Sequence, residues 1–280
     1  MSTNRELLFK YRKEGISDAV IYFALEECNG FDHLLLSQNL DKDIKDENRF
    51  VDAMNHYING EMIEYVFSKA YFLSKHFYVD NNVLIPRQET EQLVLNSAKL
   101  IREMFGDKPI KIADVCTGSG AIGISIADMF KNNKVVLTDI SNESLSVAKK
   151  NGEGLNNVSY LQGDMLEPLI KNDEKLDVIL CNPPYIEDIK TIDEKTWKQE
   201  PHLALIAMPC TLFYEKVLKD FRRIMNEKYL LAFEIGEDME EALTKLVKQY
   251  CEDAEFYFEK DMYDKTRFLY IKSANSYTNN

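Results

Sequence analysis

From Gln88 onward the sequence alternates between short β-prone runs and longer segments in which apolar residues recur at helical spacing. This alternation restricts the fold more than any other feature, because strands separated by helices pair in parallel and leave both faces of their sheet to be covered. It predicts a doubly wound α/β sheet. The expected helices are Glu91–Met104, Ser119–Phe130, Glu143–Asn151 and Leu212–Met225, and the expected strands are Ile110–Val115, Val135–Asp139, Val158–Leu161, Leu176–Cys181 and Tyr229–Glu234.

The C-terminal part departs from this alternation. Glu255–Glu259 and Arg267–Lys272 are β-prone runs joined by a short polar loop, with no helix between them. They predict an antiparallel hairpin added to an otherwise parallel sheet, which then has seven strands. The final residues, Ser273–Asn280, are expected to fray.

A different pattern precedes the alternation. From Asn4 to about Lys69, apolar residues recur at helical spacing and short breakers separate the segments, so we expect a small helical bundle. Within Tyr71–Ile85 the residues become β-prone, with Asp80-Asn81-Asn82 as a turn, which predicts a hairpin between two domains. The predicted boundaries are 1–69 for the helical domain, 70–87 for the hairpin linker and 88–280 for the α/β domain.

The charge balance disfavours a protein that grips long nucleic acids. The chain has 34 Lys and Arg residues against 47 Asp and Glu residues, which gives a net charge of −13 at pH 7. The acidic residues are spread along the sequence, and such a field repels phosphate backbones. No direct binding to DNA is therefore expected.

The cysteines indicate a reducing compartment. The five cysteines lie far apart and no two form a C-x-x-C pair, so they do not provide a disulfide framework. Met1–Gly15 lacks the apolar core of a signal peptide, and no stretch approaches the roughly 18 apolar residues of a membrane span. We therefore expect a cytoplasmic protein without a membrane anchor. The four histidines are isolated from other ligand side chains, and no metal site is predicted.

A glycine-containing loop follows the first predicted strand of the α/β domain. Ile112–Ala121 places a strand, a turn of small residues and a helix start in the order that a nucleotide-binding crossover needs. The loop lacks the Gly-Lys-Ser/Thr of a phosphate-loop ATPase, and Cys116 stands where the first glycine of G-x-G-x-x-G would stand. A tight turn without a ligand is the alternative. The candidate cofactor residues of this loop are Cys116, Thr117, Gly118, Ser119 and Gly120.

Acidic residues near the ends of the neighbouring strands extend this candidate site. Asp139 lies about twenty residues beyond the loop, where a carboxylate can accept both hydroxyls of a ribose, a spacing that NAD would also fit. Gly163-Asp164-Met165 follows the next strand, where an adenine could be sandwiched and its amine accepted by Asp164. Asp114 precedes the loop and would either orient it or meet an ammonium group of the cofactor; a plain loop cap is the alternative.

The tetrapeptide Asn182-Pro183-Pro184-Tyr185 follows the fourth predicted strand. Its two prolines fix φ and hold the preceding residue extended, so the carbonyl groups of this turn are rigidly aimed. The side-chain oxygen of Asn182 and the backbone oxygen of Pro183 can accept the two hydrogens of a planar NH₂ group, while the Tyr185 ring packs over its face. An ordinary surface turn is the alternative, but the position at the end of a strand favours a site for an NH₂ nucleophile.

Together these residues resemble the S-adenosylmethionine-dependent amino-methyltransferases. More narrowly, the chain resembles the family that methylates the glutamine of the Gly-Gly-Gln motif in class-1 peptide chain release factors. The tetrapeptide carries the broader resemblance. The narrower one is carried by Val83-Leu84-Ile85-Pro86-Arg87-Gln88-Glu89-Thr90-Glu91, by Glu200-Pro201 followed by Ala204-Leu205, and by Phe233-Glu234-Ile235-Gly236.

The resemblance implies a Rossmann-like methyltransferase sheet, S-adenosylmethionine as cofactor and class-1 release factors as protein substrates. We expect the protein to be a monomer. The helical domain would help to dock the release factor. Arg87 and Glu89 would pair with one another or border the mouth of the site, and Glu200-Pro201 would brace the loop after the tetrapeptide. The implied cofactor residues are Asp114, Cys116, Thr117, Gly118, Ser119, Gly120, Asp139, Asp164, Met165 and Asn182. The implied catalytic and substrate-binding residues are Asn182, Pro183, Pro184 and Tyr185, with Arg87 as a further substrate contact.

The sequence departs from the family pattern at three places. Cys116 stands where a glycine is usual, and a positive φ there would strain a cysteine. Met165 stands where some relatives carry a larger aromatic residue, which a flexible thioether can replace. Ile206-Ala207-Met208-Pro209-Cys210 lies where glycines are usual.

Three other functions remain open at this stage. A glutamine of a ribosomal protein would need the same chemistry and a different docking surface. An adenine-N6 DNA methyltransferase would use the same acceptors on a flipped base, although the acidic charge of the chain disfavours it. A methyltransferase-like scaffold without cofactor binding is the third alternative, and Cys116 is the feature that supports it.

Overall fold

The computed structural model describes residues 1–274, and the chain divides into two compact units after Lys69. The first unit confirms the predicted helical bundle. Thr3 and Glu6 form a capping box that starts its first helix. Leu25 and Phe50 are fully buried in its core. Its helices are α1 (Asn4–Lys13), α2 (Asp18–Asn29), α3 (His33–Gln38), α4 (Glu47–Ile58) and α5 (Ile63–Phe67).

A two-stranded hairpin follows the bundle, formed by β1 (Lys69–Phe72) and β2 (Lys75–Tyr78). Its turn is at Leu73 and Ser74, whose φ angles of 49° and 60° lie in the left-handed region. The turn Asp80-Asn81-Asn82, which we predicted within the hairpin, follows β2 instead, where the Val83 N–H donates to the Asp80 carbonyl at 3.1 Å. Left-handed residues match the twist of paired strands, which explains the two-residue connection.

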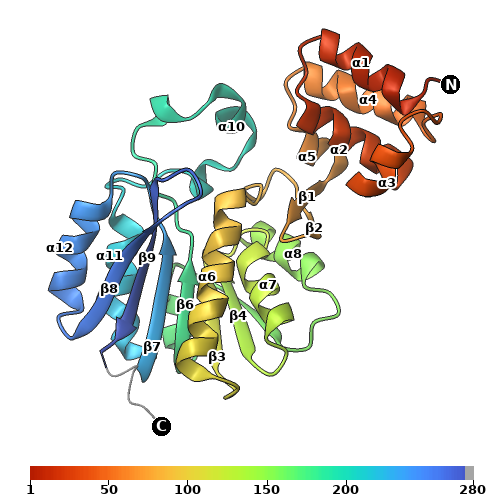
Figure 1. Cartoon of the computed structure of the whole chain (residues 1–280). Coiled ribbons are helices and arrows are strands. Elements are labelled where there is room, and N and C mark those ends of the chain that lie inside the picture. Colours follow the sequence, from red (N-terminus) through yellow and green to blue (C-terminus); the bar gives the residue numbers. More distant parts are fainter. Residues whose placement is uncertain (275–280) are drawn as a thin grey trace. The chain divides into compact units, whose positions relative to one another are not determined.

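The second unit contains a seven-stranded sheet in the order β5-β4-β3-β6-β7-β9-β8 (Figure 1). The five neighbouring strands from β5 to β7 in this order pair in parallel. β9 pairs antiparallel with both β7 and β8. The predicted doubly wound sheet and its C-terminal hairpin are confirmed. The strands are β3 (Lys111–Val115), β4 (Lys134–Asp139), β5 (Val158–Gln162), β6 (Leu176–Cys181), β7 (Met225–Glu234), β8 (Ala254–Lys260) and β9 (Thr266–Ser273).

Successive residues of the central strands supply two separate cores. Ala113 and Val115 belong to one core, and Ile112 belongs to the other, because side chains alternate across a sheet. Both faces are covered, as Figure 1 shows for the helices that flank the sheet. Helices α9 (Glu167–Lys171), α11 (Leu212–Asp220) and α12 (Glu240–Tyr250) pack on the first core, and α6 (Gln88–Phe105), α7 (Ala121–Met129) and α8 (Asn142–Asn151) pack on the second.

Some predicted boundaries are wrong. The helix expected over Leu212–Met225 ends at Asp220, and after a 3₁₀ turn Met225 already begins β7. The fraying expected for Ser273–Asn280 does not hold at Ser273, which ends β9 and is buried; residues 275–280 lie outside the described residues. The helices α9, α10 (Glu194–Gln199) and α12 were not predicted. The five residues of α9 and the six of α10 are too few for a periodic pattern, whereas α12 carries Leu243 and Val247 at helical spacing, a pattern that the prediction left unassigned.

The strand pairing determines where the candidate site residues meet. Val115 at the end of β3 pairs with Thr138 of β4 and with Cys181 of β6. The chain leaves β3 toward β4 on one side and reaches β6 on the other, which makes this edge the topological switch point of the sheet. The loop after β3, Asp139 and the tetrapeptide therefore gather at the carboxyl ends of adjacent strands.

The contact between α7 and the sheet gives a test of this arrangement. An alanine inside a helix ordinarily adds stability relative to glycine, but a Cβ at Gly123 would lie 2.8 Å from both Asp114 Oδ2 and Leu137 Cδ1, which are buried. We expect Gly123→Ala to lower the free energy of unfolding by about 1–3 kcal/mol, measured by chemical denaturation. An unchanged or higher stability would contradict the close packing of α7 on β3 and β4.

Candidate functional site

A cavity of about 500 Å³ opens at the carboxyl ends of the parallel strands of the second unit. Its wall is formed by the segment after the hairpin, the loop after β3, the ends of β4 and β5, the tetrapeptide and part of α11. Four predicted site residues, Asp114, Gly120, Pro183 and Tyr185, do not line it. The predicted residues that do are Arg87, Cys116, Thr117, Gly118, Ser119, Asp139, Asp164, Met165, Asn182 and Pro184.

The loop after β3 forms part of the cavity wall, and every second residue from Cys116 to Gly120 has a left-handed backbone. Cys116, Gly118 and Gly120 have φ angles of 61°, 55° and 84°. A Cβ at Gly118 would meet no atom within 4 Å, whereas a Cβ at Gly120 would lie 2.5 Å from the Ile124 side chain. Gly118 therefore leaves backbone open to the cavity, and Gly120 allows the packing of α7. Cys116 adopts the strained conformation that favours glycine.

Asp114 holds this loop from behind. Its side chain is fully buried, and Oδ2 accepts hydrogen bonds from the Thr117 hydroxyl and from the Gly123 N–H at 2.8 Å. The other oxygen, Oδ1, has no hydrogen-bond partner among the described residues. Burial raises the pKa of Asp114 to about 7, although the two hydrogen bonds oppose the shift.

Asp139 fixes the cavity side of the same loop. Its Oδ2 accepts from the Gly118 N–H at 2.9 Å and its Oδ1 accepts from the Ser141 N–H at 3.0 Å. Burial raises the pKa of this carboxyl group, and the backbone donors lower it. A carboxylate has about four lone-pair positions, so these two bonds leave it able to accept hydroxyl groups of a ligand.

The segment after β5 and the helix α11 contribute three further wall residues. The sequence suggested Asp164 and Met165 but not Lys216. Lys216 of α11 lines the cavity and pairs with Asp164 at 2.6 Å. Met165 has a φ angle of 47°, and its sulfur lies 3.5 Å from the Cys116 sulfur. No sequence signal identified Lys216, because it lies 52 residues after its partner in a segment read as an ordinary helix.

The tetrapeptide is anchored by side chains from distant segments. The Asn182 Nδ2 donates to Thr90 Oγ1 at 3.3 Å, and the Thr90 hydroxyl donates to Glu234 Oε2 at 2.7 Å. The Tyr185 hydroxyl donates to the other oxygen of Glu234 at 3.4 Å, and Tyr185 is not among the residues that line the cavity. Thr90 and Glu234 stand in the segments that carry the family resemblance, yet no sequence pattern indicated a role for either residue.

Arg87 pairs with Glu200, and the alternative pairing with Glu89 is wrong. The Glu200 side chain is fully buried, and its Oε1 also accepts from the Ile85 N–H at 3.0 Å. Burial raises the pKa of Glu200, and the Arg87 charge opposes the shift. This carboxylate therefore ties the segment before α6 to the segment that follows the tetrapeptide, and Arg87 remains on the cavity wall.

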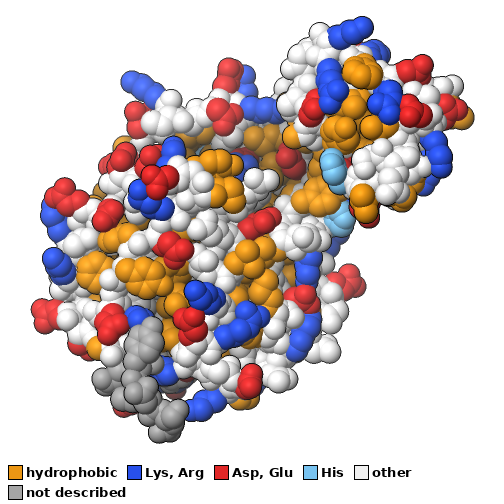
Figure 2. Space-filling view, viewed as in Figure 1, with side chains coloured by type: hydrophobic (Ala, Val, Ile, Leu, Met, Phe, Trp, Pro, Cys, Tyr) orange, Lys and Arg blue, Asp and Glu red, His pale blue; other side chains and the backbone are white. Residues whose placement is uncertain are grey.

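Three further observations concern the surface charge, membrane-spanning helices and metal ligands. On the face shown in Figure 2, Lys and Arg side chains are interspersed with Asp and Glu and form no continuous basic band. In residues 1–274, no helix is both long and apolar enough to cross a bilayer. Within the same residues, no group of three or more His, Cys, Asp and Glu side chains could hold a metal ion.

Known proteins similar to this chain are methyltransferases. Residues 92–199 match the family model described as "Methyltransferase small domain". A release factor glutamine methyltransferase of Bacillus cereus is 34% identical over 243 residues, which cover 85% of this chain and 86% of that protein. One of Bacillus subtilis is 35% identical over 269 residues, which cover 94% and 88%. A solved methyltransferase of Pyrococcus furiosus has 16% identity and a TM-score of 0.51, covers 80% of this chain and 98% of that chain, and supports the fold alone.

The buried carboxyl groups make the stability depend on pH. Burial raises the pKa of Glu234, like that of Asp114, to about 7, whereas an unfolded carboxyl group titrates near about 4. The folded protein therefore binds more protons than the unfolded chain between these values, and stability falls as the pH rises from about 4 to about 7. We expect the melting temperature of Glu234→Gln to fall less than that of the unmodified protein between about pH 5 and pH 8. Glu252→Gln, at an exposed position, is the matched control. If the melting temperatures of all three proteins changed equally with pH, the raised pKa of Glu234 would be contradicted.

Proposed function

Because the chain belongs to the release factor glutamine methyltransferase family, we propose that it methylates the side-chain amide nitrogen (N5) of the glutamine in the Gly-Gly-Gln motif of class-1 release factors. The observation that carries this proposal is the position of Asn182, whose side chain lines the cavity beside the cofactor loop. An amide acceptor at that point suits an NH₂ nucleophile that must be held in line with a methyl group.

The cavity volume of about 500 Å³ lies in the range of small-molecule sites, and the groups on its wall suit the parts of S-adenosylmethionine. The Asp139 carboxylate would accept the ribose hydroxyls, and the open backbone at Gly118 would lie against the methionine portion. Met165 would pack on the adenine, whose amine Asp164 would accept beside Lys216. When bound, S-adenosylmethionine supplies an electrophilic methyl group on a positively charged sulfur.

The residues of the chain would activate the glutamine by orientation. An amide nitrogen is a weak nucleophile because its lone pair is delocalised into the carbonyl group. Asn182 Oδ1 and the Pro183 carbonyl would accept its two hydrogens and so favour positive charge on the nitrogen as it attacks. Fixed orientation can lower a barrier by up to about 7–11 kcal/mol. The rigid Pro183-Pro184 turn keeps both acceptors in place before the substrate arrives.

Docking of the protein substrate would involve more than the tetrapeptide. Arg87 borders the cavity with more than a third of its side chain exposed, while its ion pair with Glu200 fixes its position. The unit Met1–Lys69 folds around its own core and exposes Phe9, Leu34 and Leu35. We propose that both contribute to binding of the release factor and that the enzyme acts as a cytoplasmic monomer.

The acceptor role of Asn182 has a direct test. Unmodified release factor is incubated with the enzyme and S-adenosylmethionine, and the Gly-Gly-Gln peptide is analysed by mass spectrometry. A gain of about 14 Da is expected on the glutamine, from the addition of one CH₂ group. Asn182→Ala should bind cofactor but lose turnover by roughly 10²–10³-fold, because it removes an acceptor that acts on the developing charge. Asn172→Ala, at an exposed position, is the control, and near-normal kcat for Asn182→Ala would contradict the assignment.

The ribose role of Asp139 predicts a loss of a different kind. Asp139→Ala removes the acceptor of the cofactor hydroxyls and also releases the Gly118 N–H. We expect the Kd for S-adenosylmethionine, measured by calorimetry, to rise at least tenfold, with no change for the exposed Asp107→Ala. An unchanged Kd would count against both the ribose contact and the support of the loop.

A further inference from the structure

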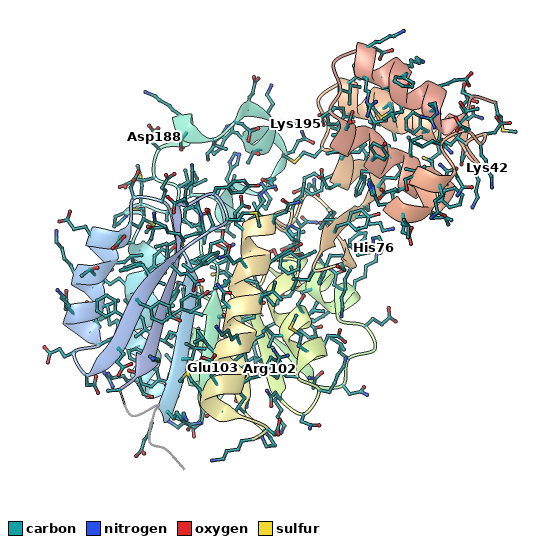
Figure 3. All side chains as sticks on the ribbon, in the orientation of Figure 1. Lys42, His76, Arg102, Glu103, Asp188 and Lys195 are labelled. Atoms are coloured by element: carbon teal, nitrogen blue, oxygen red, sulfur yellow. The ribbon has the colours of Figure 1, made fainter. Side chains whose placement is uncertain are left out.

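The hydrogen bonds behind Asn182 form a directed chain of three side chains. Thr90 lies in the first turn of α6 and lines the cavity, and Figure 3 shows Arg102 and Glu103 at the opposite end of this helix. Glu234 ends β7 and is almost fully buried. The chain runs from the Asn182 amide to the Thr90 hydroxyl at 3.3 Å and on to the Glu234 carboxylate at 2.7 Å.

A hydroxyl group has a single hydrogen, and this determines the direction of the chain. An ionised carboxylate only accepts, so the Thr90 hydrogen is used on Glu234. The Thr90 oxygen can then only accept from Asn182. The two ends of a side-chain amide have nearly the same shape, and their partners decide which end faces which way. The Asn182 NH₂ group must therefore face Thr90, and Oδ1 is left for the other side.

We propose that Thr90 and Glu234 are positioning residues that keep the Asn182 Oδ1 turned toward the substrate NH₂ group. The inference rests on the proposed function, because only a donor substrate needs an acceptor at that point. With the opposite orientation, Asn182 would present its own NH₂ group to the NH₂ group of the glutamine, and two donors cannot form a hydrogen bond. The same side chain would then obstruct the reaction that it otherwise promotes.

Protonation of Glu234 would release this control. A protonated carboxyl group can donate to Thr90, and the Thr90 hydrogen is then free to bond the Asn182 oxygen. Glu234 is nearly enclosed, which favours its neutral form, whereas the Arg267 charge favours the ionised form. The titratable groups that face Glu234 are Glu89 from α6, Tyr185 after β6, Tyr214 from α11, and Arg267 and Tyr270 from β9.

The kinetic consequence has a definite sign. Because the ionised carboxylate holds the productive orientation, kcat should rise with pH as Glu234 loses its proton and then reach a plateau. Glu234→Gln cannot ionise, and its amide can donate to Thr90 as well as accept from it. Its kcat should be reduced and should lack the rise that belongs to Glu234.

Substitutions at Thr90 separate the hydroxyl group from the shape of the side chain. Thr90→Val keeps the volume and removes the hydroxyl, so kcat should fall about 10- to 100-fold with little change in the Kd for S-adenosylmethionine. Thr90→Ser restores the hydroxyl and should recover most of the lost rate. Ser97→Ala is the matched control. It removes a buried hydroxyl from the same helix, and this hydroxyl has no hydrogen-bond partner among the described residues.

The outcomes distinguish this inference from the proposed function. Methylation of the glutamine by the unmodified enzyme, loss in Thr90→Val and recovery in Thr90→Ser would support both. If the unmodified enzyme is active and Thr90→Val has normal kcat, or Thr90→Ser is as slow as Thr90→Val, the positioning role is overturned and the function stands. A pH profile of kcat that is the same in Glu234→Gln and the unmodified enzyme would also overturn it. If the unmodified enzyme leaves the glutamine unmodified, the proposed function fails, and the inference that rests on it fails with it.

Discussion

The parallel pairing of β3 with β4 on one side and with β6 on the other is the interaction on which the site depends. It places the ends of three strands at one edge, where Val115, Thr138 and Cys181 are paired neighbours. Each strand is followed at once by a loop that carries polar groups, so residues far apart in the sequence meet without a dedicated connection. A shift of one residue in either pairing would turn the side chains at these ends to the other face of the sheet. The register is set by the alternating burial of the strands in two cores.

Buried carboxyl groups then hold the loops and side chains of the site in fixed orientations. Asp114 holds the cofactor loop, Glu200 holds the segment before α6, and Glu234 anchors the side chains behind the tetrapeptide. Burial raises the pKa of all three, which means that the fold carries a cost for keeping them ionised. Their partners are mostly backbone N–H groups and hydroxyls, which restrict geometry without adding charge. The site therefore gains orientation at the expense of stability.

The sequence was sufficient for the fold and for much of the cavity wall, because periodicity and turn chemistry are local properties. It predicted the strands of the sheet, the C-terminal hairpin, and wall residues such as Gly118, Asp139 and Asn182, and it missed the helices α9, α10 and α12. It failed where the partner lies far along the chain. The pairing of Arg87 with Glu200 and that of Asp164 with Lys216 depend on which strands become neighbours. The Thr90 hydroxyl was invisible for the same reason, since its role exists only once α6 is placed against β7 and β6.

Two departures from the family pattern are in contact with one another in the structure. Cys116 adds a side chain where glycine is usual, and Met165 is smaller and more flexible than the aromatic residue of some relatives. Their sulfurs lie 3.5 Å apart on the cavity wall, and both residues have left-handed backbones. A flexible thioether can adapt its shape to the Cys116 side chain beside it. Cys116 is the feature that favours a scaffold without cofactor binding, but its side chain leaves both the Gly118 backbone and the Asp139 carboxylate on the cavity wall.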